Sequence, residues 1–185
     1  MEKIIFLKGK MVILRPLDKE KDLENVTKWI NDPEIRPFVS NFVPLTKKDE
    51  EEFFDRKKEN ERLVVIETKD GKSIGTMGLH KIDHRNGFAE TGALIGEKDY
   101  WGKGYGTDAK MILLNHAFNT ENLRKVLSSA LAFNGRSIGY NKKCGYKICG
   151  KFEKHIFVNG EYVDLIHLVV WKEDFLPLWK KYQEE

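Results

Sequence analysis

The chain has 185 residues, of which 41% are hydrophobic, which is enough for a single domain, residues 1–185, with a core of its own. Its 32 lysine and arginine residues nearly balance 29 acidic ones, so composition gives no reason to expect a nucleic-acid partner. The apolar run at residues 4–7 is too short for a signal peptide or a membrane span. Cys144 and Cys149 match neither a disulfide scaffold nor a metal site. We therefore expect a cytoplasmic, metal-free protein without a membrane partner.

The first third of the chain predicts one strand and two helices. Residues 11–16 are apolar and typical of a strand, and residues 19–30 place Leu23, Val26 and Trp29 on one helical face. Pro33 ends that helix. A second helix is expected from Thr46, its N-cap, to about Glu61. The acidic run at 49–52 belongs in the first turns of this helix, where negative charge is favourable.

Three consecutive strands follow, at residues 63–67, 74–82 and 88–95. The first two flank Asp70-Gly71, a dipeptide typical of a tight hairpin, so we expect antiparallel pairing. Beyond them the pattern predicts a helix over 108–118 with Thr107 as its N-cap, a strand over 125–133, a short helix over 136–143, and a hairpin over 147–171. The hairpin has Asn159-Gly160 at its tip. This order predicts a mixed α/β (α+β) sheet flanked by helices.

The segment at residues 100–107, Tyr-Trp-Gly-Lys-Gly-Tyr-Gly-Thr, is typical of an anion-binding loop. Its three alternating glycines let the backbone approach a ligand closely, and the following helix presents unpaired N–H groups and the positive end of its dipole. The spacing is not that of a P-loop, which argues against an NTP-dependent enzyme. Its position after hairpin-linked strands is wrong for a dinucleotide fingerprint. The chemistry therefore favours a different pyrophosphate ligand.

Three motifs in this order resemble the GNAT family of acetyl-CoA-dependent N-acetyltransferases. Residues 101–106 match the family's Gln/Arg-x-x-Gly-x-Gly/Ala signature except at its first residue. Asn134, Ser137 and residues 143–146 are similar to its Asn-x-x-Ser/Ala and Lys-x-Gly-Phe/Tyr segment. Residues 14–17 and 29–34 resemble the branch that acetylates ribosomal proteins and polyamines. The resemblance covers roughly residues 10 to 172.

The resemblance implies a GNAT fold, a mostly antiparallel mixed sheet with two parallel strands that splay apart, and acetyl-CoA as cofactor. The pantetheine arm would pair with the backbone of the strand at 93–95, and the loop amides would hold the pyrophosphate. The short helix and the residue before it would lie close to the cofactor. The implied cofactor-binding residues are Ala93, Leu94, Ile95, Trp101, Gly102, Lys103, Gly104, Tyr105, Gly106, Thr107, Asn134, Ser137, Asn141 and Lys143.

Acetyl transfer to an amine needs a base for the amine and a proton for the departing thiolate. Glu90 is the candidate base, although period two alone does not decide whether it faces the cleft or solvent. Asn134 is a further candidate catalytic residue near the cofactor. The branch usually has a tyrosine two residues before the lysine of the Lys-x-Gly-Phe/Tyr motif, which is Lys143 here, and this chain has Asn141 at that position. Tyr140 is the candidate acid. It is one residue earlier, so its side chain points about 100° away around the helix. The alternatives are another donor, such as Ser137, or a thiolate that leaves unassisted.

The leading hypothesis is an N-acetyltransferase that acts on a primary amine by direct attack in a ternary complex. The acceptor is either a small-molecule polyamine or a protein N-terminus. A non-catalytic acyl-CoA-binding module is the alternative function. The aromatic residues Trp171, Phe175 and Trp179 are expected to pack the C-terminal segment against the sheet, or else to form a homodimer contact.

Overall fold

The computed structural model describes residues 4–39, 43–56 and 59–184, and an eight-stranded sheet runs through them. In spatial order the strands are β1 (Leu7–Lys8), β2 (Val12–Pro16), β3 (Arg62–Thr68), β4 (Ser73–Asp83), β5 (Phe88–Ile95), β6 (Lys125–Leu131), β8 (Glu161–Trp171) and β7 (Lys147–Val158). Each neighbouring pair is antiparallel except β5 and β6, which are parallel. The expected mixed, mostly antiparallel sheet is confirmed.

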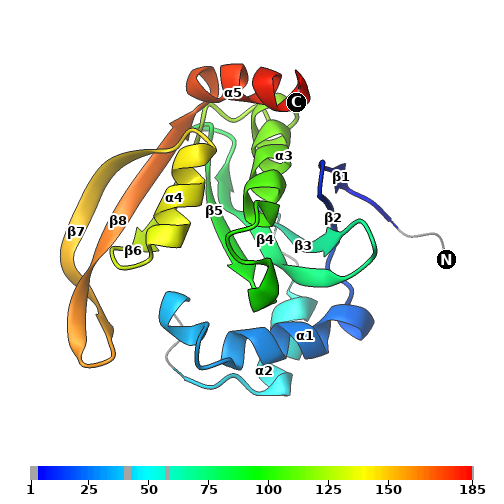
Figure 1. Ribbon diagram of the computed structural model, residues 1–185, viewed down its shortest axis with the longest axis vertical. Coiled ribbons are helices and arrows are strands. Elements are labelled where there is room, and N and C mark those ends of the chain that lie inside the picture. The colour runs from blue at the N-terminus through cyan, green and yellow to red at the C-terminus, as the bar shows by residue number, and fades with distance from the viewer. Residues whose placement is uncertain (1–3, 40–42, 57–58, 185) are drawn as a thin grey trace.

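The helices lie around this sheet as Figure 1 shows: α1 (Lys19–Asn31) and α2 (Lys47–Asp55) at one end, α5 (Lys172–Glu184) at the other, and α3 (Tyr105–Asn119) and α4 (Gly135–Lys143) between them. The alternation of β5 shows which helix covers which face. Thr91 bonds to Lys110 of α3, whereas Leu94 packs with Val26 and Trp29 of α1. Successive strand residues point to opposite faces, so α3 and α1 cover opposite faces of β5.

The main core forms between α3 and the sheet. Helix α3 is buried on almost every side, and its aliphatic residues 111–114 are at most 5% exposed. Asp108 in its first turn accepts the backbone N–H groups of Lys10, Met11 and Val12, at 2.9–3.1 Å, and the hydroxyl of Tyr182. This carboxylate therefore fastens the start of β2 and the end of α5 to the helix that begins at the glycine loop.

Most predicted elements are confirmed, and the turns are those the sequence specifies. Gly71, between β3 and β4, has a φ of 93°, and Asn159 and Gly160, between β7 and β8, have φ values of 50° and 91°. Such positive values are the reason that Asn-Gly and Asp-Gly occupy tight hairpins. The capping box of α2 is also present, because the Thr46 and Asp49 side chains each accept the other residue's backbone N–H.

Three predicted boundaries are wrong. Helix α2 ends at Asp55 instead of near Glu61: residues 57–58 lie outside the described part of the chain, residues 59–60 form a turn, and Glu61 directly precedes β3. Residues 59–61 are all polar and offer no apolar face for packing, so no apolar packing stabilises a helix there. Strand β6 ends at Leu131, because the chain turns toward the N-cap of α4. Helix α3 begins at Tyr105, before the expected Thr107 cap.

Two features of the surface bear on partners. Within the described ranges no helix is both long enough and apolar enough to cross a membrane. The β7–β8 hairpin exposes several large apolar side chains, whereas Phe175 of α5 is fully buried against the core as expected. The homodimer stays a prediction. The exposed apolar residues of the hairpin are Ile148, Phe152, Phe157 and Tyr162.

Candidate active site

The two parallel strands separate partway along their length. Strand β5 pairs with β6 from Phe88 to Thr91, opposite Lys125 to Ser128, and beyond Thr91 it pairs with β4 alone. The backbone of Ala93, Leu94 and Ile95 therefore borders a gap on the β6 side. A cleft of about 800 Å³ occupies this gap, and all three residues line it, as expected.

The glycine loop closes one end of this cleft. Gly104 is the N-cap of α3, with a φ of 92° and no side chain to cap the helix, and its carbonyl accepts the first helical bond from Asp108, at 2.9 Å. The amides of Tyr105, Gly106 and Thr107 precede that bond, so the helix leaves them without intrahelical partners. The Thr107 cap predicted from the sequence is wrong because Tyr105 and Gly106 already belong to the helix.

The loop residues divide between two hollows. Trp101, Gly102, Gly104, Gly106 and Thr107 line the cleft. Lys103 and Tyr105 instead line a smaller hollow of about 310 Å³ beside it. The expected contact of Lys103 with a pyrophosphate therefore stays a prediction, and the amides are the groups that the cleft exposes.

Trp101, which departs from the family signature, has a clear structural role. Its indole Nε1 donates to the Ile95 carbonyl at 2.7 Å, which joins the loop to the end of β5. The guanidinium of Arg136, in the first turn of α4, lies 3.8 Å from the centroid of the Trp101 ring and 5.1 Å from that of Phe38. Such stacking is favourable for arginine. Arg136 also lines the cleft, so it adds a cation that sequence reasoning missed.

The short helix α4 presents some of its predicted residues to the cleft and hides another. Asn134 is its N-cap and accepts the Ser137 amide at 3.1 Å; both residues line the cleft, together with Tyr140 and Lys143. Asn141 is fully buried and its amide donates to the Ser137 carbonyl at 2.9 Å. Asn141 does not border the cleft, and its contact with a cofactor stays a prediction.

Behind the point of separation lies a buried hydrogen-bonded cluster that sequence reasoning also missed. Lys110 of α3 is fully buried, and its Nζ donates to Thr91 Oγ1 at 2.7 Å. The same hydroxyl lies 2.9 Å from the Tyr146 hydroxyl, and Lys110 Nζ is 5.3 Å from the ring centroid of Tyr140. Burial lowers the pKa of Lys110 to about 7 and raises the pKa of Tyr140 far above its usual range. Tyr140 therefore keeps its proton at neutral pH, as a candidate acid must.

Glu90, the predicted base, does not line the cleft. Its carboxylate accepts Lys81 Nζ at 3.1 Å, and its side chain is 39% exposed. Its catalytic role stays a prediction. The residue opposite it on β4, His80, does line the cleft. No local pattern in the sequence points to His80, because its significance comes from the strand beside it.

On the α1 side, the cleft widens into a chamber that we call the acceptor chamber. Its walls are mainly apolar, and Glu50 of α2 lines it although this residue is only 5% exposed. Burial, and then the neighbouring Asp49, raise the pKa of Glu50. Among the described residues its carboxylate has no hydrogen bond or ion pair. The apolar lining residues are Val26, Ile30, Ile35, Phe38, Val39, Leu45, Phe53 and Leu63.

The residues present fit coenzyme A. A Cβ placed on Gly102 would meet nothing within 4 Å, so the space over the loop is open, and the unpaired amides at the start of α3 are suited to a diphosphate. The freed edge of β5 is suited to an extended amide-containing arm. This combination, a helix N-terminus beside two diverging parallel strands, defines an acyl-CoA-dependent transferase.

Comparison with known proteins identifies the family. A family model described as an acetyltransferase (GNAT) domain matches residues 11–147, and the chain belongs to this family. It is an acetyl-CoA-dependent N-acetyltransferase.

The relatives include proteins named for spermidine and for ribosomal acetylation. The spermidine N(1)-acetyltransferase of Escherichia coli K12 is 28% identical over 170 residues, which span 89% of this chain and 88% of that protein. YdaF of Bacillus subtilis, whose name assigns it provisionally to the ribosomal N-acetyltransferases, is 32% identical over 106 residues, 57% of each chain. The fold is similar to that of the Vibrio cholerae spermidine N-acetyltransferase, solved with CoA and spermine. The TM-score is 0.83 at 23% identity, covering 89% of this chain and 98% of the other.

We expect the substitution Gly104→Ala to weaken CoA binding about tenfold, measured by calorimetric titration. A side chain at a φ of 92° costs about 1–2 kcal/mol, so the free loop relaxes to another conformation and binding must restore the amide array. Gly150→Ala is the control, since a Cβ there meets nothing within 4 Å and Gly150, on β7, does not line the cleft. Equal CoA affinities in the two variants would contradict the role given to the Gly104 backbone.

Proposed function

We propose that this enzyme acetylates a primary amine of a polyamine such as spermidine. The observation that carries the proposal is the buried carboxylate of Glu50, which has no hydrogen bond or ion pair among the described residues and lies in the wall of a mainly apolar chamber. A polyamine alternates short methylene chains with ammonium groups. Its methylene segments suit the apolar walls, and an ammonium distant from the reacting one suits Glu50, because a buried carboxylate gains most from a cation.

We further propose direct attack in a ternary complex. One continuous cleft joins the glycine loop to the acceptor chamber, so both substrates can lie in it together. Bound acetyl-CoA supplies an activated acetyl thioester. The chain supplies the site: loop amides and Arg136 for negative charge, the freed β5 backbone near Leu94 as a partner for the carbonyl, and Tyr140 as a proton donor. Since the reaction draws on acetyl-CoA, we place the enzyme in the cytoplasm.

The relatives support the polyamine over a protein N-terminus. Relatives named for spermidine cover nearly the whole chain, whereas the relative named for ribosomal proteins covers 57% of it. The test is CoA release from acetyl-CoA with spermidine, spermine and peptides with free N-termini. We expect release with the polyamines. Release with the peptides alone would reject the proposed acceptor, and tight CoA binding with no release for any amine would favour a binding module.

We expect the substitution Glu50→Gln to raise the KM for spermidine about tenfold or more, because a hydrogen bond to a charged partner contributes about 1.5–3 kcal/mol. The dissociation constant of CoA should not change. As the pH falls, Glu50 gains a proton early because its pKa is raised, so the wild-type KM should rise in acid while that of the variant stays flatter. Steady-state kinetics across pH measures both effects.

Glu52→Gln is the matched control, since Glu52 lies on the same helix and its side chain is exposed. An equal rise in KM for Glu50→Gln and Glu52→Gln would indicate a general charge effect of α2, and would remove the argument for a specific ammonium site.

A further inference from the structure

A histidine at the point where β5 and β6 separate has the surroundings of a general base. His80 and Glu90 are opposite one another on β4 and β5, so both side chains lie on the face of the sheet that α1 covers. The register of these strands shifts between His80 and Asp83, and Lys81 has a φ of 51°. This irregularity brings Lys81 to Glu90, and the Glu90 carboxylate is engaged there while His80 remains in the cleft wall.

Two glycines form the floor beneath the imidazole. Gly78 and Gly92 are cross-strand partners, and His80 Nε2 lies 3.2 Å and 3.3 Å from the positions that a Cβ on each would occupy. A side chain at either position would displace the ring. Gly92 is also the first residue of β5 beyond the last pair with β6. The Nε2 atom therefore lies at the start of the gap, beside the backbone stretch that borders the cleft.

The other ring nitrogen faces a carboxylate. Glu61, directly before β3, has its Oε1 3.8 Å from His80 Nδ1, and the two side chains are only 17% and 33% exposed. A carboxylate on the Nδ1 side favours the tautomer with its proton on Nδ1 and stabilises the imidazolium once Nε2 has accepted a proton. Among the described residues, the other charged groups near this end of the chamber include Glu90 and Lys81, which pair with each other, and Glu50 of α2.

We propose that His80 Nε2 removes the proton of the attacking amine, directly or through one water, and that Glu61 is the positioning residue behind it. The proposal rests on the proposed function. As the amine nitrogen forms its bond to the acetyl carbon, an N–H bond breaks and its proton goes to Nε2. The carbon–sulfur bond breaks, and the sulfur leaves with the electron pair and takes a proton from Tyr140 or solvent. His80 returns its proton to solvent, and Tyr140, when it is the donor, regains a proton from solvent, so the sum is amine plus thioester giving amide plus thiol.

The test is the pH dependence of kcat/KM with whichever amine the acceptor panel identifies, for His80→Gln, Glu61→Gln and Glu90→Gln. We expect His80→Gln to lower kcat about a hundredfold, since a positioned base contributes 10²–10⁴-fold. It should also remove the acidic limb of the profile, which is the fall in kcat/KM as the pH is lowered. Glu61→Gln should keep that limb but move it to lower pH, because the imidazolium loses its carboxylate. A merely structural Glu61 would leave the limb in place.

The matched control is His84→Gln, since His84 is an exposed histidine in the turn after β4 and should keep wild-type kinetics. An unchanged dissociation constant for CoA in each variant shows that the fold is intact. The proposal is overturned if His80→Gln keeps its acidic limb and falls within threefold of wild type, or if Glu90→Gln removes the limb instead. If no amine is acetylated by the wild type, the proposed function fails first, which is a different result.

Discussion

Replacing Lys110 by methionine will make the protein more stable at pH 7, by several kcal/mol, with a gain that shrinks as the pH rises. The ammonium has a pKa of 10.5 in the unfolded chain and about 7 in the folded one, because it is fully buried. Between these values the unfolded state binds more protons. Raising the pH therefore stabilises the wild type by up to about 1.4 kcal/mol per pH unit through this group, and below pH 7 the group adds no further pH dependence.

Urea unfolding of both proteins from about pH 7 to pH 9 measures this difference. Methionine does not titrate, so the gap between the two free energies of unfolding isolates Lys110 from the tyrosines and cysteines. At high pH the variant should be slightly less stable, since the bond to Thr91 is worth about 1 kcal/mol. Lys142→Met, an exposed lysine on α4, is the control. Parallel curves for wild type and Lys110→Met would show that this lysine is not held neutral.

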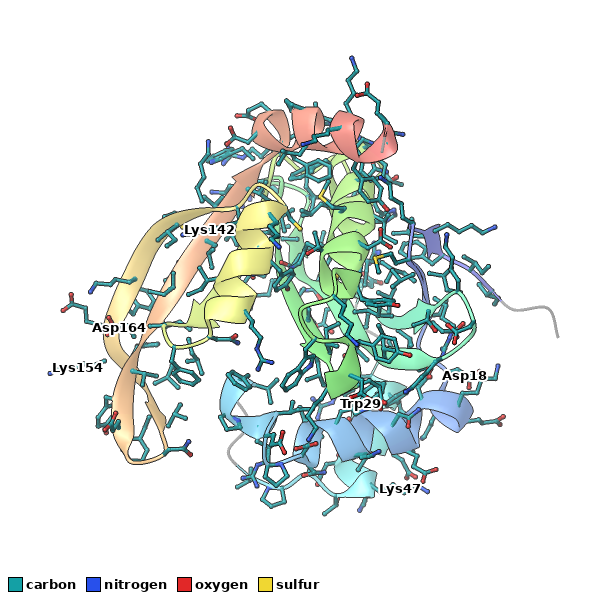
Figure 2. All side chains as sticks on the ribbon, in the orientation of Figure 1. Asp18, Trp29, Lys47, Lys142, Lys154 and Asp164 are labelled. Atoms are coloured by element: carbon teal, nitrogen blue, oxygen red, sulfur yellow. The ribbon has the colours of Figure 1, made fainter. Side chains whose placement is uncertain are left out.

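Gly96→Ala is the second large effect, and we expect it to cost about 1–3 kcal/mol or more and to damage the acceptor chamber. A Cβ on Gly96 would lie 2.0 Å from Cγ of Trp29, and that ring cannot move freely, because its Nε1 donates to Glu97 at 2.9 Å. Figure 2 shows Trp29 on the side of α1 that faces the sheet. Displacing the ring moves α1, whose Val26 and Ile30 line the chamber.

A double-mutant cycle identifies the cause. In a Trp29→Ala background the added methyl group has no ring to meet, so Gly96→Ala should cost little there, measured by urea unfolding. The KM for the amine should rise, because α1 contributes Val26 and Ile30 to the chamber wall. An equal cost in both backgrounds would mean that the backbone of Gly96, and not the Trp29 contact, sets the penalty.

Most helices and strands could be predicted from the sequence because the patterns that specify them are local. Alternating and helical apolar patterns predicted the strands and helices, and the turn dipeptides fixed two hairpins through φ values that their residues readily adopt. The failures are also local in origin. Thr107 has a side chain typical of an N-cap, yet Gly104 is the cap. Capping preference alone does not show that Tyr105 and Gly106 already belong to the helix.

The glycine loop could be predicted from the sequence, whereas the chamber beside α1 could not. The glycine loop is contiguous in sequence, and its amides need only the backbone, so a motif suffices to identify it. The sequence pattern places Glu50 only in the acidic run at the start of a helix. Its burial in the chamber wall follows from the packing of α2 against α1.

The sequence by itself determined the family, the order of the elements and the anion-binding loop, because these depend on spacing along the chain. Tertiary structure decided the rest. The β4 irregularity pairs Glu90 with Lys81 and leaves His80 in the cleft, and the packing of α3 buries Lys110 behind the separating strands. Each of these outcomes depends on which residue lies across a strand or beneath a helix. Residues far apart in sequence set that environment. The environment in turn decides whether each side chain is charged and which groups it contacts.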